Sequence, residues 1–384
     1  MIPRFQFSYT IHDFIDETIR AEKGYGAGLD EFQNYFNGSQ PIFVGKARIG
    51  IRMALQALGL KSGSAVGVQP FTCSSVLSAI KRAGFRIVFI DMDRNLRMSL
   101  VDLKNKNNSI DALIVTHIFG FPDDVESCRI IMGDKPIIED CAQAFLSAYK
   151  GKPVGMSAEA GIFSTGYGKL FGIGYGGFVV SGDNRISTSL LKQAGQLQFP
   201  SKAAIARQSF RNLGLGILYH PLVYSLFTYT VKKRFGISNA RLQEYPIRET
   251  SMASSGISRI ALNFTKNQQR VQRQRANGIL LKGLVDQRYN PIEPLIGSEP
   301  NYFVFLLQSE NRDLIVNYLA TKGIEAGKFF SNSIYWVQEF GYHTGDCPGF
   351  ERIASTLFTL PCHDYLSEKQ VNYIAETLNK FHVA

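Results

Sequence analysis

The most constraining feature of this chain is a run of residues, 41–182, in which short apolar segments alternate with segments of helical periodicity. Short apolar strands separated by helices are typical of a mostly parallel sheet that is covered by helices on both faces. The strands are expected at about 64–69, 86–91, 112–118, 136–140 and 176–180. Ligands of such sheets bind at the carboxyl ends of the strands, so the residues just after these segments are the first site candidates.

Beyond this run the pattern changes. Residues 256–285 are polar and rich in Gln and Arg, which predicts one long helix. A strand and two further helices are expected at 301–307, 311–322 and 367–381. The sequence therefore predicts a large domain at 1–250, including an N-terminal extension, and a smaller C-terminal α+β domain at 251–384.

The chain carries a net charge of +10, with 42 Lys and Arg against 32 Asp and Glu. This balance favours anionic partners. No nucleic-acid-binding motif accompanies the charge, so we expect small phosphorylated ligands and no nucleic acid. The N-terminus lacks the apolar core of a signal peptide, and the five cysteines form no CxxC pair, so a cytoplasmic protein without a disulfide framework is expected. His343, Cys347 and His363 lack metal-site spacing, and no metal is expected.

Asp140 and Gln143 stand in the segment EDCAQAF at the end of an expected buried strand. Their three-residue spacing would point both side chains in one direction on a helical turn. An aspartate can pair with the pyridine nitrogen of pyridoxal phosphate (PLP), and a glutamine can donate to the ring hydroxyl. The alternative for Asp140 is the N-cap of a following helix.

Lys169 lies between two glycine-rich segments, FSTGYG and LFGIGYGG. Glycines allow the backbone to approach a ligand closely, and a lysine can form an imine with the PLP aldehyde. The same glycines could belong to a dinucleotide-binding loop. That alternative is weak, because a strand and not a helix is expected to follow them.

Three segments, EDCAQAF (139–145), FSTGYGKL (163–170) and GYGGFVV (174–180), resemble the DegT/StrS-type sugar aminotransferases, which are fold-type-I PLP enzymes. That family has an EDxAQ motif, a serine five residues before the Schiff-base lysine, and a Gly-Gly pair before a strand. Weaker matches extend over nearly the whole chain. The resemblance implies an α/β fold: a PLP fold-type-I large domain with a mostly parallel mixed sheet, and a smaller C-terminal α+β domain.

The resemblance also assigns roles to residues. Lys169 would be the imine lysine and general acid and base, Asp140 would pair with the pyridine nitrogen, and Gln143 would contact the ring oxygen. Ser164 would reach the phosphate. The family's phosphate loop falls on Lys46-Ala47-Arg48, opening a helix at Ile49. Arg48 stands in place of the family's threonine and can bind phosphate through its guanidinium; the alternative is a solvated cation at a helix start.

Three features depart from the family pattern. Cys73, in QPFTCSS, stands where the family stacks an aromatic ring on the cofactor, so Cys73, Phe71 or His117 is expected to pack there. The region 246–256 lacks the asparagine that the family supplies from the partner subunit. The stretch SNSIYWVQ replaces a Pro-Leu-His near the sugar site. These departures leave the substrate side less well defined than the cofactor side.

The implied reaction is transamination by a homodimer. An amino acid, expected to be glutamate, would donate its amino group to a nucleotide-activated keto sugar in surface polysaccharide or amino-sugar biosynthesis. Dehydration of a sugar on the same cofactor is an alternative, against which Lys169 argues. A non-catalytic binding or regulatory protein of the same fold is the other alternative.

Residues 213–231 contain no formally charged side chain and are followed by Lys232-Lys233-Arg234. The segment is long enough to span a membrane, but His220 and Pro221 make it a poor candidate. We expect a buried or subunit-interface segment. The alternative is peripheral contact of residues 213–234 with anionic lipid.

Overall fold

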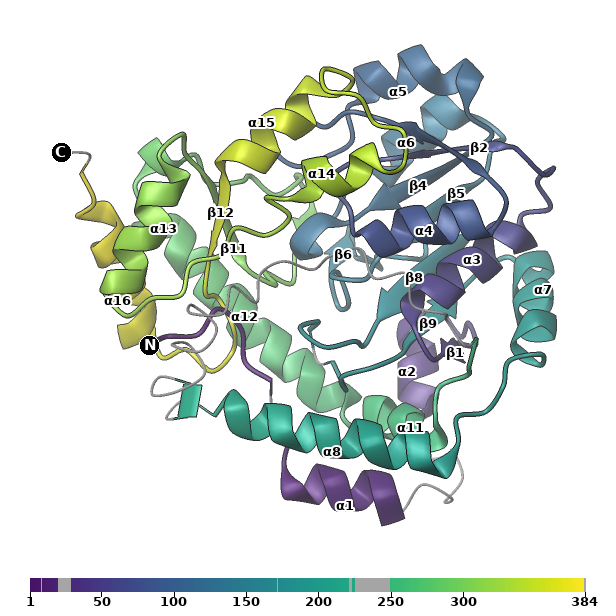
Figure 1. Cartoon of the computed structure of the whole chain (residues 1–384), viewed down its shortest axis with the longest axis horizontal. Helices are drawn as coiled ribbons and strands as arrows, with labels where there is room; N and C mark the ends of the chain where they lie inside the picture. Colours follow the sequence, from purple (N-terminus) through teal and green to yellow (C-terminus); the bar gives the residue numbers. More distant parts are fainter. Residues whose placement is uncertain (8, 20–28, 171, 221–222, 225–248, 383–384) are drawn as a thin grey trace.

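The computed structural model describes residues 1–7, 9–19, 29–170, 172–220, 223–224 and 249–382. Its main sheet has seven strands in the order β1-β9-β8-β5-β4-β2-β3 (Figure 1). The four neighbouring pairs from β8 to β3 are parallel, whereas β9 pairs antiparallel with both β1 and β8. The α/β class with a mostly parallel mixed sheet is therefore confirmed.

The strands of this sheet are short and apolar. Their bounds are β1 (Ile42–Val44), β2 (Ala65–Val68), β3 (Arg86–Phe89), β4 (Ala112–Thr116), β5 (Ile137–Asp140), β8 (Ala160–Ser164) and β9 (Gly177–Val180). Successive side chains of a strand point to opposite faces. In β4, Ile114 belongs to the largest buried cluster, while Leu113 and Val115 belong to a separate one. Both faces of the sheet are thus covered, as the apolar runs predict.

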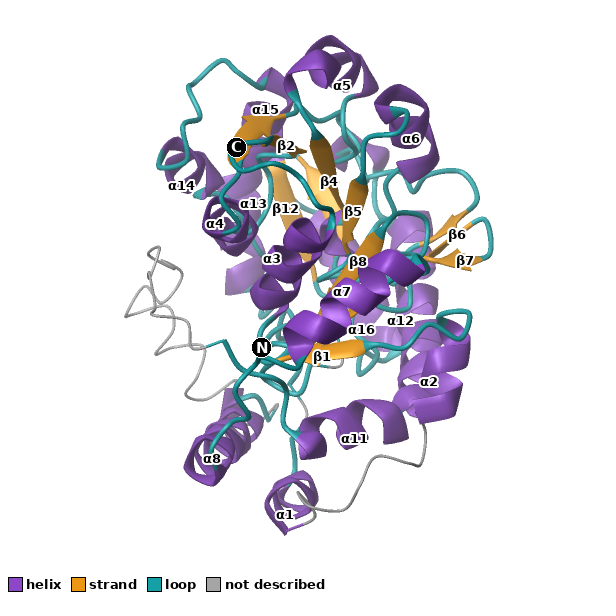
Figure 2. Ribbon diagram, turned by 90° about the vertical axis from the view of Figure 1, so that its right-hand side faces the viewer, coloured by secondary structure: helices purple, strands orange, loops and turns teal. Residues whose placement is uncertain are grey.

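The helices that cover the sheet follow the expected alternation. They are α3 (Ala47–Ala57), α4 (Ser74–Arg82), α5 (Leu100–Lys106), α6 (Val125–Met132) and α7 (Asn184–Ala194). Residues of α3, α4 and α7 pack into one buried cluster and residues of α5 and α6 into another, so the two groups lie on opposite faces (Figure 2). Side chains of Ser99, Asp124 and Asp183 cap α5, α6 and α7, which explains where these helices begin.

A small antiparallel sheet of two strands and several helices form the C-terminal part of the chain. These elements are α11 (Ser254–Leu262), α12 (Phe264–Leu284), β11 (Phe305–Gln308), α13 (Arg312–Thr321), α14 (Ser333–Gln338), α15 (Pro348–Thr356), β12 (Leu357–Leu360) and α16 (Glu368–Asn379). The largest buried cluster includes both Val66 of β2 and Leu307 of β11. Because one core joins the two parts, the domain division near residue 250 stays a prediction.

Two elements of the C-terminal part differ from the sequence predictions. The expected single helix at 256–285 is two helices that meet at Asn263, whose side-chain Nδ2 donates to the Arg259 carbonyl (2.8 Å). Asparagine competes in this way for backbone hydrogen bonds and so interrupts helices. The strand expected from residue 301 begins only at Phe305, because Tyr302 has a positive φ of 49°.

The remaining elements lie at the periphery. Helices α1 (Ile11–Ile19), α2 (Leu29–Tyr35) and α8 (Lys202–Leu218) lie along the lower part of Figure 1, and β6 (Ala148–Tyr149), β7 (Lys152–Pro153) and β10 (Ser298–Glu299) form a small separate sheet. Among the helices that the structure describes, none has the length and apolar character to cross a membrane.

The apolar segment at 213–231 begins inside α8. Ile217 and Leu218 are exposed, whereas Tyr219 and Tyr224 are buried in an aromatic cluster with Phe7. The part of this segment after Tyr224, and the basic residues 232–234, lie outside the described residues. Lipid contact through 213–234 therefore stays a prediction.

Candidate active site

One cavity of about 320 Å³ lies at the carboxyl ends of the parallel strands. Thr116, Asp140 and Ser164 end β4, β5 and β8, and all three line it. Every residue predicted from the sequence as part of the site lines the same cavity: Ala47, Arg48, Cys73, Asp140, Gln143, Ser164 and Lys169. Residues from well-separated parts of the chain thus meet where an α/β sheet normally binds its ligand.

Asp140 is a buried carboxylate at the end of β5, with 3% of its surface exposed. Burial raises its pKa, while the hydrogen bond from the Ala142 N–H and the positive charge of Lys169 oppose that shift. The Ala142 N–H donates to Oδ1 over 3.0 Å, and no helix follows. The alternative of a helix N-cap is therefore wrong, and Asp140 is free to act on a ligand.

Gln143 lies in a series of turns at 141–147, and not on the helical turn that the sequence predicted. The reason is tertiary: Nδ2 of Asn301 donates to the carbonyl oxygens of Gln143 and Phe145 (both 2.9 Å), which a helix would need for its own bonds. The Phe119 N–H donates to the side-chain Oε1 of Gln143 over 3.0 Å. The side-chain NH₂ of Gln143 is thus the group left to donate into the cavity.

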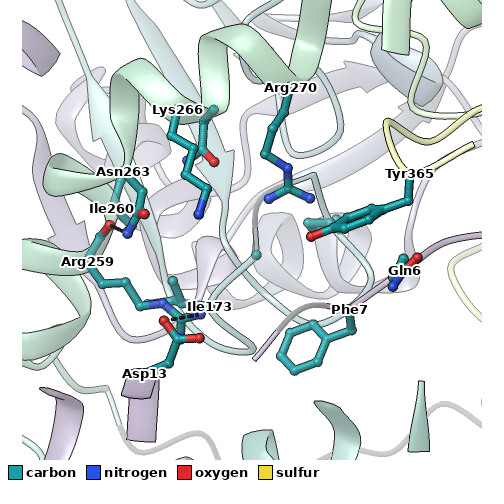
Figure 3. Close-up of a pocket in the computed structure, with 13 residues that line it drawn as sticks. Gln6, Phe7, Asp13, Ile173, Arg259, Ile260, Asn263, Lys266, Arg270 and Tyr365 are labelled. Atoms are coloured by element: carbon teal, nitrogen blue, oxygen red, sulfur yellow. Dashed lines mark hydrogen bonds and ion pairs between the residues drawn. The ribbon is translucent and has the colours of Figure 1, made fainter. Parts of the chain in front are cut away.

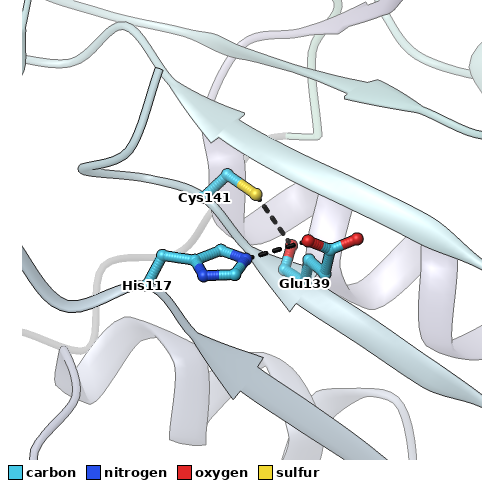
Figure 4. Close-up of side chains that lie close together, drawn as sticks. All are labelled: His117, Glu139 and Cys141. Carbon is cyan, nitrogen blue, oxygen red and sulfur yellow. Dashed lines mark hydrogen bonds and ion pairs between the residues drawn. The ribbon is translucent and has the colours of Figure 1, made fainter. Parts of the chain in front are cut away.

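His117 and Glu139, the residue before Asp140 in the chain, form a buried pair (Figure 4). His117 Nδ1 accepts from the Asp123 N–H (2.9 Å), so its ring proton lies on Nε2 and is donated to Glu139 Oε2 (2.9 Å). Glu139 also accepts from the N–H groups of Gly155 and Ser157. Cys141 Sγ lies close enough for the three side chains to share an ion by distance alone. Both ring nitrogens of His117 and both carboxylate oxygens of Glu139 already have hydrogen-bond partners, so these atoms need no ion.

The three candidates for packing on a ligand ring differ in their positions. His117 does not line the cavity, and Phe71 is fully buried against Phe119 and Phe330. Cys73, in contrast, is exposed to the cavity. Of the three candidates from the sequence, Cys73 is the one whose position allows ring contact.

Lys169 lies in a turn that follows β8, and its N–H donates to the Gly166 carbonyl (3.2 Å). The N–H of Gly172, three residues further on, donates to the Lys169 carbonyl (3.1 Å). Strand β9 and not a helix follows these glycines, which excludes the dinucleotide-loop alternative. The local fold therefore presents Lys169 from a tight glycine-rich turn.

Lys169 also lines a second, smaller cavity of about 100 Å³ (Figure 3). Lys266, Arg270 and Tyr365 line this cavity from α12 and the C-terminal part. The Arg270 guanidinium binds both carboxylate oxygens of Asp364, at 2.7 and 3.2 Å. The lysine thus stands between a large cavity and a small basic one.

Helix α3 begins at Ala47, two residues earlier than predicted, because the extended Lys46 is its N-cap. Ala47 and Arg48 therefore lie in the first helical turn, whose N–H groups lack intrahelical acceptors and suit an anion. Lys46 is exposed as a residue, but partial removal of its ammonium group from water and the nearby positive charges of Arg48 and Arg211 lower its pKa. Three cations gather at this end of the cavity.

Several lining residues have no counterpart in the sequence prediction. Thr72 and Thr116 are buried, and their hydroxyls have no hydrogen-bond partner in the part of the chain that the structure describes. A buried unpaired hydroxyl is costly, so these groups indicate a ligand with polar atoms. Thr72 stood in the motif QPFTCSS and could have been chosen. Gln208 and Arg211 of α8 lie in no motif that would have indicated a binding site from the sequence.

Comparison with known proteins places this site in a family. The DegT/DnrJ/EryC1/StrS aminotransferase family model matches residues 30–379. GDP-perosamine synthase of Escherichia coli O157:H7 is 27% identical over 398 residues, covering 99% of this chain and 98% of that protein.

Two solved structures share the fold. The sugar aminotransferase CalS13 from Micromonospora echinospora has a TM-score of 0.76 at 21% identity, with 99% of each chain covered. The PLP form of Spr1654 from Streptococcus pneumoniae has a TM-score of 0.74 at 18% identity, covering 98% of this chain and 97% of that one. With the family model matched over most of its length, the chain belongs to the DegT/DnrJ/EryC1/StrS aminotransferase family.

Proposed function

We propose that this protein is a PLP-dependent aminotransferase that moves an amino group from an amino acid, glutamate, to the keto group of a nucleotide-activated sugar. The observation that carries the proposal is the single cavity that joins Lys169, Asp140 and a cationic helix start. The names of the relatives, GDP-perosamine synthase and a sugar aminotransferase, support a sugar linked to a nucleotide as the acceptor.

The residues present fit PLP. A pyridine nitrogen needs an acidic partner, and Asp140 is buried and engages only one backbone N–H among the described groups. A ring hydroxyl needs a donor, which the Gln143 amide offers. The unpaired hydroxyls of Thr72 and Thr116 offer further polar contacts. Asp140 and Gln143 thus match two different atoms of the cofactor ring.

Bound PLP supplies an electron sink for negative charge next to the reacting nitrogen. Asp140 supports this by holding a proton on the ring nitrogen, because a buried carboxylate gains most from a positive partner. Lys169 binds the cofactor and moves the proton between carbon and nitrogen as general acid and base. Cys73, Ala142 and Ile118 line the cavity and limit water around these groups.

The other end of the cavity, lined by Lys46, Arg48 and Arg211, would hold the cofactor phosphate. Ser164 and the first turn of α3 provide hydrogen-bond donors, and Arg48 provides a guanidinium in place of the family's threonine. A phosphate there would also relieve the repulsion among the neighbouring cations. As parts of the same proposal, the protein works as a cytoplasmic homodimer in amino-sugar or surface polysaccharide biosynthesis.

The test has two half-reactions. Protein loaded with PLP is mixed with glutamate, and we expect the visible absorbance of the cofactor to bleach while 2-oxoglutarate forms. The resulting amino form is then offered a panel of nucleotide-linked keto sugars, and we expect the absorbance to return with one of them. A protein that binds PLP but reacts with no amino acid would refute the proposal in favour of a non-catalytic role.

A further inference from the structure

We propose that helix α8 completes the phosphate end of the PLP site within the same chain, with Arg211 binding the cofactor phosphate. The inference rests on the proposed function, because it takes PLP as the ligand of the large cavity. It adds a residue that the sequence motifs did not assign. It also replaces a contact that the family resemblance implied from a partner subunit.

The first observation is the way α8 is fixed to the glycine-rich segment after Lys169. Asn212 is fully buried, and its Nδ2 donates to the Ile173 carbonyl over 2.7 Å. Gln208 Nε2 donates to Asn212 Oδ1 (2.9 Å), one turn earlier on the same helix. Two polar side chains of α8 thus hold the helix on this segment, and Arg211 lies between them in sequence.

Gly174 explains how α8 comes so close. It has a φ of +87°, and a Cβ on it would lie 2.1 Å from Asn212 Oδ1. Only glycine adopts this conformation and leaves room for the asparagine. The close approach places Gln208 and Arg211 on the wall of the large cavity, beside Gly174 and Gly176.

The charges at this wall favour an anion. Four basic residues line the cavity, and Asp140 is the one acidic residue among the described lining residues. Arg211 is exposed and has no ion-pair partner among the described residues. Arg211 and Arg48 are both near enough to Lys46 to disfavour its charged form. Three like charges in one place are stabilised when a phosphate lies between them.

The residues that line the cavity together with Arg211 indicate that its ligand is the cofactor phosphate. Ser164, which follows the family pattern for a phosphate contact, and the first turn of α3 line the same cavity as Arg211. The family's partner-subunit asparagine has no counterpart in residues 246–256. A guanidinium binds a phosphate through two parallel N–H groups, which makes Arg211 a stronger contact than an amide.

The experiment measures the Kd of PLP, and of pyridoxal, which lacks the phosphate, by titration of the cofactor-free protein. We expect Arg211→Ala to raise the Kd of PLP about 10-fold or more and to leave that of pyridoxal unchanged. The Kd of PLP for Arg211→Lys should lie between those of wild type and Arg211→Ala, because lysine keeps the charge but loses the two parallel N–H groups. The matched control is Arg207→Ala, an exposed arginine one turn earlier that does not line the cavity.

The outcomes separate the possible failures. Equal PLP affinity of Arg211→Ala and wild type would overturn the inference, and so would an equal loss for PLP and pyridoxal, which would mean a structural role. A raised KM for the sugar acceptor with unchanged PLP affinity would assign the arginine to a substrate phosphate instead. If wild-type protein binds neither compound, the proposed function itself is wrong.

Discussion

The two ends of the large cavity are built in different ways. At the ring end, Asp140 and Gln143 are 3% and 8% exposed and are fixed by hydrogen bonds from backbone groups. At the phosphate end, Lys46 and Arg211 are exposed and Arg48 is half-buried. The ring end is thus preorganised for directed contacts, whereas the phosphate end attracts a charge and leaves the final geometry to long side chains.

The ring end also has a second layer of support. Glu139 accepts a hydrogen bond from His117, which accepts one from the Asp123 N–H. The Asp123 carboxylate accepts from Gln69 Nε2 (2.9 Å). Gln69 in turn accepts from the Thr116 N–H over 2.7 Å. This network ties the ends of β2, β4 and β5 together. We therefore expect changes at the ring end to affect turnover and folding, and changes at the phosphate end to affect cofactor affinity.

Lys169 is the proposed imine lysine, so its removal should have the largest effect. We expect Lys169→Ala to abolish transamination and covalent attachment of PLP, because Lys169 is the lysine that the family motif assigns to the imine. Mass spectrometry after borohydride reduction tests for attachment. Lys266→Ala, at the neighbouring small cavity, is the control and should keep the covalent adduct. A reducible adduct in Lys169→Ala would show that another lysine holds the cofactor.

The supporting network predicts a pH effect on stability. Burial raises the pKa of Asp123 from 3.8 to about 6. The folded protein therefore holds this proton more tightly than the unfolded chain does. The stabilisation from Asp123 is complete below pH 3.8 and is lost as the pH rises towards 6, amounting to about 3 kcal/mol.

Urea unfolding from pH 4 to pH 7 measures this effect. Asp123→Asn should lack the decline of the unfolding free energy over this range that wild type shows. Asp134→Asn, at an exposed carboxylate, should keep it. Parallel pH profiles for wild type and Asp123→Asn would mean that the carboxylate titrates alike in the folded and unfolded protein.

Asp140→Asn should separate turnover from binding. The amide cannot stabilise a positive ring nitrogen, so we expect kcat to fall about 10- to 100-fold, the value of a charge-assisted hydrogen bond. The Kd of PLP should change less than kcat, because the proposed phosphate contacts are unchanged. Kinetics at saturating PLP, with the Kd measured in parallel, tests both statements. Near-normal kcat would assign the ring nitrogen to another residue.

Arg48→Ala should give the opposite pattern and the smallest effect. Loss of the guanidinium should raise the Kd of PLP about 10-fold and leave kcat at saturating PLP near the wild-type value. Arg52, one turn further along α3, pairs with Glu249 and does not line the cavity, so Arg52→Ala is the control. An unchanged Kd in Arg48→Ala would return Arg48 to a solvated cation and reduce the contrast between the two ends.

The sequence alone was enough for a mostly parallel sheet and for five of its strands, whereas β1 and β8 were not among the expected strands. The apolar run that ends at Asp140 locates this residue at a strand end. Lys169 stands among glycines, but its role and that of Ser164 came from the resemblance to the family motif. The predicted positions of helix ends were less accurate. A helix start depends on the backbone conformation of one capping residue, such as the extended Lys46.

Tertiary structure alone decided the walls of the cavity. Asn301 fixes the turn of Gln143 from 158 residues away, and Asn212 docks α8 from 39 residues beyond Ile173. Short-range periodicity records which face of a helix or strand is buried, but not which distant segment will cover it. The conversion of an expected helix into turns at 141–147, and the placement of Arg211 at the cavity, both follow from such long-range hydrogen bonds, which form only when the chain is packed.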